Sequence, residues 1–129
     1  MKSETLKTLE ERYKVTLPQK YKQWYLNTDL STCFVGSDIA PPYIYELTDW
    51  ASETLRKANI DFTLPQNAFV FFMHQGYEFC FFECNGDDDP PVWIFNEYDT
   101  RMPEVRWQSF SAYLAYWFSS DADAITSDS

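Results

Sequence analysis

The first part of the chain places apolar residues at helical spacing between charged ones. Leu6, Leu9 and Tyr13 follow Ser3, a residue type that caps helices well, and they predict an amphipathic helix. A second helix is predicted to start at Pro18, because proline suits the first helical position and disfavours helical backbone just before it. Aromatic residues make up its apolar stripe: Tyr21, Trp24 and Tyr25.

The segment from 28 to 45 has no clear period and predicts an extended connection, in which Tyr43–Tyr45 can pair as a short edge strand. Helical spacing returns after Thr48, a residue suited to capping, and predicts a third helix that ends at Asn59. Its apolar face is formed by Trp50, Ala51, Leu55 and Ala58.

Beyond residue 65 the pattern changes to short apolar runs separated by turn formers. His74-Gln75-Gly76 separates the first two runs, and Asn85–Pro91 is dense in Gly, Asp and Pro. The predicted strands of this antiparallel meander are Phe69–His74, Tyr77–Cys84, Val92–Tyr98 and, as an extension, Val105–Trp107.

The last strongly patterned segment follows Ser109, which is predicted to cap a closing helix. Its apolar positions fit one helical face: Phe110, Tyr113, Leu114, Trp117 and Phe118. The order of elements predicts an α+β fold, an antiparallel meander with helices packed on one face, N-terminal helices and a C-terminal helix. We expect one domain over residues 1–120 and a flexible acidic tail over 121–129.

Composition narrows the classes of partner. The 129 residues carry a formal net charge of −10, and residues 87–129 hold nine acids against two arginines. Such a chain repels nucleic-acid phosphates and anionic lipid head groups, so neither nucleic acid nor membrane is an expected partner. Five Trp, nine Tyr and eleven Phe exceed what a minimal core needs, which favours some aromatic residues on a contact surface.

The apolar runs are too short to cross a bilayer, and the N-terminus lacks a signal-peptide pattern. Cys80 and Cys84 fall in one predicted strand, about 13 Å apart, too far for a disulfide or for one metal ion. Together with Cys33 they make an odd number of thiols. We expect free thiols in a cytoplasmic protein.

Groups for catalysis or cofactor binding are sparse. His74 is the single histidine and is expected to be a turn residue with a satisfied ring. Asp87, Asp88 and Asp89 do not complete a calcium loop, because the glutamate at the last loop position is missing and two prolines follow. With three glycines and no phosphate-binding motif, the chain predicts no cofactor and no enzymatic activity.

The acidic residues make better sense as recognition elements for a basic protein. Asp87–Asp89 are expected at a hairpin tip, with Glu83, Glu97 and Asp99 at strand ends nearby, so that their fields reinforce one another. Tyr77, Trp93 and Tyr98 are candidate anchors close to these carboxylates, with core burial as the alternative for each.

Three stretches together resemble the SUKH superfamily and, within it, the Smi/Knr-type domain. Val15–Tyr25 is similar to the family's Leu-Pro opening of a helix with an aromatic residue three positions after the proline. Phe69–Tyr98 resembles its central meander with an acidic loop, and Trp107–Leu114 its last helix with Trp, Ser-Phe and Leu. The connection over 28–45 is poorer in glycine than the family pattern.

The resemblance implies a non-enzymatic role. Bacterial members are widely immunity proteins that neutralise a cognate toxin of a polymorphic toxin system, frequently a nuclease, and fungal relatives are interaction modules in cell-wall signalling. The first hypothesis is therefore an immunity protein. The alternatives are a regulatory or scaffold module for an endogenous protein and a small hydrolase that uses Asp or Glu alone. The sequence leaves the oligomeric state open.

Overall fold

The computed structural model describes residues 2–30 and 37–119, with side chains to residue 117. The expected tail over 121–129 lies outside these residues. The α+β class, with N-terminal helices and a C-terminal helix, is confirmed. In chain order the elements are α1 (Lys2–Tyr13), α2 (Gln19–Asn27), β1 (Ser37–Asp38), η2 (Tyr43–Tyr45), α3 (Leu47–Lys57), β2 (Ala68–His74), β3 (Glu78–Glu83), β4 (Val92–Asn96), β5 (Glu104–Trp107), α4 (Phe110–Leu114) and η3 (Ala115–Ser119).

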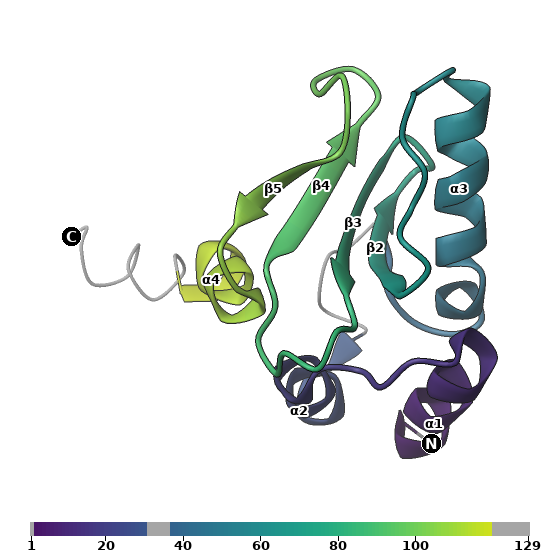
Figure 1. Ribbon diagram of the computed structural model, residues 1–129. Coiled ribbons are helices and arrows are strands. Elements are labelled where there is room, and N and C mark those ends of the chain that lie inside the picture. Colours follow the sequence, from purple (N-terminus) through teal and green to yellow (C-terminus); the bar gives the residue numbers. More distant parts are fainter. Residues whose placement is uncertain (1, 31–36, 120–129) are drawn as a thin grey trace.

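The five strands form one antiparallel sheet in the order β1-β2-β3-β4-β5 (Figure 1). This is the predicted meander, extended at one edge by β5 and at the other by β1. Ser37 and Asp38 of β1 pair with His74 and Met73 of β2. A bulge between Val70 and Phe72 shifts the register of β2 against β3.

The expected edge strand at Tyr43–Tyr45 is wrong, because this segment forms the short 3-10 helix η2. The peptide groups here bond locally, from Ile44 N–H to the Ala40 carbonyl (3.1 Å) and from Glu46 N–H to the Tyr43 carbonyl (2.8 Å). The buried Ile44 side chain anchors the turn in the core. The edge strand is instead Ser37–Asp38.

Three predicted helix starts also shift. Ser3 lies inside α1, and Pro18 has extended backbone (φ −60°, ψ 143°), so it precedes α2 as its cap. Thr48 lies inside α3, and its hydroxyl accepts the Val70 N–H at 3.0 Å. The sequence pattern predicted that the Thr48 hydroxyl caps the helix. It bonds instead to a backbone N–H on the part of the β2 edge that β1 does not pair with.

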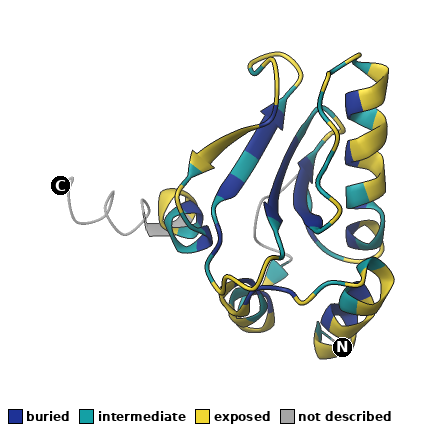
Figure 2. Cartoon of the chain, viewed as in Figure 1, coloured by how far each residue is buried: buried dark blue, intermediate teal, exposed yellow. Residues whose placement is uncertain are grey.

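Aromatic packing determines how the layers meet. Phe82 of β3 contacts Tyr21 of α2 (ring centroids 5.4 Å apart) and Phe110 of α4 (5.8 Å). Its neighbour Phe81 points to the opposite face, where it contacts Phe62 at 6.4 Å in the segment after α3. The expectation of helices on one face holds for α2 and α4. On the opposite face, Phe62 in the segment after α3 covers Phe81. Figure 2 shows β2, β3 and β4 as the most buried part of the fold.

The closing helix is capped as predicted, since the Ser109 hydroxyl accepts the Ala112 N–H at 3.0 Å. Among the described side chains, the predicted apolar stripe is buried or half-buried only as far as Leu114. Residues Ala115–Ser119 form a π-helical turn, which changes the angular spacing, and Trp117 is 42% exposed. The Phe118 side chain lies outside the described residues.

Tyr21 provides a test of this packing, because its buried hydroxyl has no hydrogen-bond partner among the described residues. We expect Tyr21→Phe to raise the free energy of unfolding by about 1 kcal/mol, because it removes an unsatisfied buried polar group. Tyr25, equally buried on the same helix, is the matched control because its hydroxyl is hydrogen-bonded to Thr5. Tyr25→Phe should lower stability by about 1 kcal/mol. Urea unfolding measures both, and equal effects would contradict this account.

Candidate protein-binding surface

The candidate recognition residues lie at two opposite ends of the sheet. Glu78 of β3 pairs with Asn96 of β4, and Phe81 pairs with Trp93. The acidic loop between these strands is thus at one end, whereas residues 97–99 lie beside the β2–β3 turn at the other (Figure 1). β3 has six residues, which separates the ends by about 17 Å. The expectation of one continuous acidic cluster is therefore wrong, because successive turns of a meander alternate between the two ends.

We call the first region the tyrosine end, and it consists of Tyr77, Glu97, Tyr98 and Asp99. The Tyr77 and Tyr98 rings lie 5.2 Å apart, and Tyr98 is 79% exposed. The Glu97 N–H donates to the Tyr77 carbonyl at 2.9 Å, which joins the two turns. Glu97 and Asp99 are exposed, and neither takes part in the ion pairs seen among the described residues.

The backbone of the tyrosine end is held by Asn96 and Thr100. The Asn96 side-chain oxygen accepts the Tyr98 N–H at 2.9 Å, and its carbonyl accepts the Thr100 N–H at 2.9 Å. In return, the Thr100 hydroxyl accepts the Asn96 N–H at 2.9 Å. An exposed tyrosine on a turn fixed in this way loses little conformational entropy when it binds a partner.

The second region is the acidic loop, Asn85–Asp89, and much of its polar chemistry is used within the protein. The half-buried Asp89 carboxylate accepts the Ser111 N–H of α4 at 2.8 Å. The Asp87 carboxylate accepts the Asp89 N–H at 2.9 Å, and the Asp88 carbonyl accepts the Lys20 N–H of α2 at 3.0 Å. The loop therefore joins the first turns of α2 and α4.

Sequence reasoning missed the structural role of Asp89. A carboxylate near the first turn of a helix stabilises it through the free N–H groups and the helix dipole. Asp89 and Ser111 are 22 positions apart in the chain. No local motif signals such a contact.

The remaining two candidates are placed differently. Glu83 is half-buried at the end of β3, where it pairs with Ala68. The Trp93 ring stacks on Phe81 at 5.4 Å with an interplanar angle of 14°, and it contacts Phe62 at 6.0 Å. Trp93 is thus half-buried against the core, on the sheet face opposite α2 and α4.

The His74 ring contacts other side chains, and Cys80 and Cys84 lie partly or fully buried in the fold. His74 Nδ1 lies 2.8 Å from the Ser37 hydroxyl, and its ring contacts Tyr77 edge-on at 5.7 Å. Cys80 is buried and Cys84 is half-buried. Burial, as the main cause, raises the pKa of Cys80 far above its ordinary value and that of Cys84 to about 12. In the described part of the chain no three metal-ligating side chains come together.

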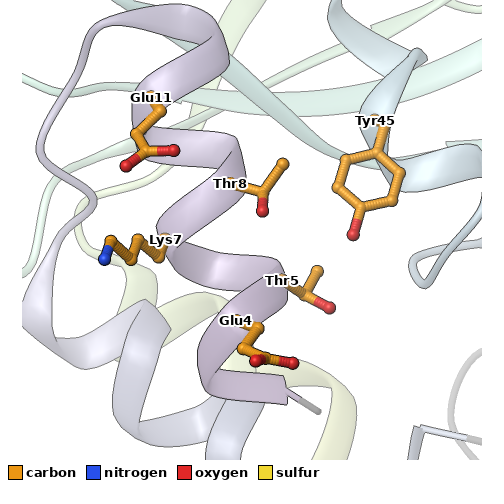
Figure 3. A pocket seen from close by; sticks show the side chains of 6 residues that line it. All are labelled: Glu4, Thr5, Lys7, Thr8, Glu11 and Tyr45. Carbon is orange, nitrogen blue, oxygen red and sulfur yellow. The ribbon is translucent and has the colours of Figure 1, made fainter.

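Among the described residues, one surface hollow is lined by polar side chains. It lies between α1 and Tyr45, encloses about 530 Å³ and is open to solvent. Thr5 and Thr8 point toward Tyr45, whereas Lys7 points away from it (Figure 3). Its lining residues are Glu4, Thr5, Lys7, Thr8, Glu11 and Tyr45.

The fold places helices around an antiparallel meander, with exposed tyrosine and carboxylate side chains at one end of the sheet. A match to the SMI1 / KNR4 family (SUKH-1) covers residues 1–116, and the chain belongs to this family. The resemblance in the sequence is thereby confirmed. Membership is consistent with a non-enzymatic binding or immunity role and suggests a protein partner. No curated protein and no solved structure matches the chain. The helices of the described residues are all too short or too polar to cross a membrane.

Asp89→Ala tests the tie between the acidic loop and α4. We expect the free energy of unfolding to fall by about 1–2 kcal/mol, because the Ser111 N–H loses its charged acceptor. Asp88→Ala removes the same charge from an exposed side chain and should change stability by less than about 0.5 kcal/mol. Thermal or urea unfolding gives the difference, and equal values for the two variants would rule out the capping role.

The thiols provide a pH test. A thiol pKa of about 12 leaves about one Cys84 side chain in 10⁴ ionised at pH 8, so alkylation should be slow. Cys33→Ser removes the third thiol, so that only Cys80 and Cys84 react. In this variant we expect iodoacetamide to alkylate them about 10³-fold faster in the unfolded chain than in the folded one. Folding raises the pKa of both thiols, so protonated thiols favour the folded state. Their contribution to the free energy of unfolding is complete below about pH 9 and is lost as the pH rises through the pKa values of the folded protein. Fast alkylation of the folded protein at pH 8 would contradict the burial.

Proposed function

We propose that this protein is a cytoplasmic immunity protein, which binds a cognate toxin with a basic surface and blocks its active site without catalysing a reaction. The observation that carries the proposal is the tyrosine end of a chain of the SUKH-1 family. There Tyr98 is 79% exposed on a hydrogen-bonded turn, between two carboxylates that form no ion pair with any described residue. Tyrosine is one of the residue types enriched at binding hot spots, because it brings a large rigid surface.

Electrostatics supports a basic partner. The net charge of −10 attracts a positively charged protein, and a nuclease toxin that binds phosphodiesters presents such a surface. In this proposal Glu97 and Asp99 at the tyrosine end steer the toxin and flank its contact with Tyr98. Asp87 and Asp88, at the far end of β3, add to the general field but lie outside the contact.

The first experiment identifies the toxin and measures protection. The tagged protein is purified from its host at low salt, and the proteins released at high salt are identified. We expect a basic toxin domain, whose expression stops growth unless this protein is co-expressed. Recovery of endogenous regulatory or cell-wall proteins alone, without protection against any toxin, would favour the scaffold alternative.

The tyrosine end is tested with the purified toxin domain. We expect Tyr98→Ala to weaken binding by about 2 kcal/mol, roughly 30-fold, mainly through faster dissociation. Tyr43→Ala, at a tyrosine on η2 that is 51% exposed, is the matched control and should leave affinity unchanged. A loss of affinity in the control alone would move the interface to η2 and α3.

The two acidic regions are compared by equal changes of charge. Glu97→Gln with Asp99→Asn should slow association by about tenfold at low salt, because both charges lie at the contact. Asp87→Asn with Asp88→Asn removes the same two charges and should slow association by no more than about threefold. The association rate in stopped flow decides between them, and the reverse order would place the contact at the acidic loop.

A further inference from the structure

Within the described residues, no strand pairs with the outer edge of β5, the last strand of the sheet. β5 ends the strand order, and its residues Glu104, Val105 and Arg106 are exposed (Figure 2). At the opposite side of the sheet, β1 has two residues, and the nearby Val70 N–H is taken by the Thr48 hydroxyl. The β5 edge is therefore the place where another strand can add to the sheet.

The charges along β5 are complementary to themselves. Arg106 Nη2 lies 2.7 Å from Glu104 Oε2, so both side chains lie on the same side of the strand. Val105, 41% exposed, lies between them in the chain. If two copies of the strand pair antiparallel about Val105, Glu104 of each copy lies opposite Arg106 of the other. Directly opposed side chains are about 5 Å apart at Cβ, so opposite charges there attract.

We propose that two copies of this chain associate through their β5 edges, in antiparallel register centred on Val105, to give a continuous sheet across a two-fold dimer. The same register brings Trp107 of each copy against Pro103 of the other. Proline lacks an N–H donor, so the backbone ladder ends there and spans residues 104–106. A ladder this short, between chains that each carry a net charge of −10, gives a weak and reversible dimer.

Charged residues on an edge strand also occur as protection against pairing. Such charges prevent pairing when the edge strands of two copies carry the same sign, because the facing side chains then repel each other. Glu104 and Arg106 have opposite signs at positions that the two-fold axis exchanges, so they attract in the register centred on Val105. The intramolecular pair between them is exposed and contributes little, which leaves both charges available to the second copy.

The experiment is sedimentation of the full chain between about 1 µM and 1 mM, the range in which weak dimers dissociate. We expect Arg106→Glu and Glu104→Arg each to raise the dimer dissociation constant at least tenfold, because like charges then face each other. The double variant E104R/R106E restores the complementarity and should return the constant to within about threefold of the unchanged chain. An equimolar mixture of the two single variants should form heterodimers.

The Glu104→Arg variant separates strand pairing from bulk charge. It makes the chain less negative, so general repulsion alone would make it dimerise more strongly than the unchanged protein. Circular dichroism and thermal unfolding verify that each exposed substitution leaves the fold intact. A chain that stays monomeric throughout the range, a double variant that fails to recover, or stronger association of Glu104→Arg would each overturn the proposal. Toxin binding is measured separately, so its outcome does not affect this one.

Discussion

The contact among Tyr21, Phe82 and Phe110 is the interaction on which the rest of the structure depends. These three fully buried rings come from α2, β3 and α4, and their centroids lie 5.4–5.8 Å apart. Phe71 of β2 joins them, stacked on Phe82 at 5.0 Å. Edge-to-face and stacked pairs each contribute about 0.5–1.5 kcal/mol beyond the area they bury. The cluster thus holds two helices that are far apart in the chain against the same two strands.

This packing makes the two ends of the sheet unequal. Because α2 and α4 are held on one face, their first turns lie close enough for the acidic loop to bond to both, through the Asp88 carbonyl and the Asp89 carboxylate. At the other end, Glu97 and Tyr98 sit on a turn that bonds to itself and to the Tyr77 carbonyl. Carboxylates used in internal bonds are less available to a partner. This difference is why the proposed function assigns recognition to the tyrosine end and a mainly structural role to the acidic loop.

Much of the fold and part of the candidate surface could be predicted from the residues. Apolar periodicity located the helices to within a few residues, the runs after residue 65 located the strands, and the Ser109 cap is present in the structure. Tyr77 and Tyr98 were expected near Glu97 and Asp99, and they are neighbours. Their expected closeness to Asp87–Asp89 was wrong, although the alternation of turns in a meander already separates them. That error arose from treating sequence proximity as spatial proximity.

By itself, the sequence determined the fold class and the order of β2 to β5, because periodicity and turn chemistry act over a few neighbouring residues. Its resemblance to a known family indicated the family. Only the tertiary structure decided which polar and aromatic groups are used internally. Asp89 binds α4, Thr48 binds the β2 edge, and Trp93 packs on Phe81, whereas Tyr98 is left exposed. Each of these outcomes depends on a contact, or the lack of one, between segments distant in the chain. Local pattern carries no information about which distant group will meet a given side chain, and that is why only the fold separates the exposed candidate residues from those used internally.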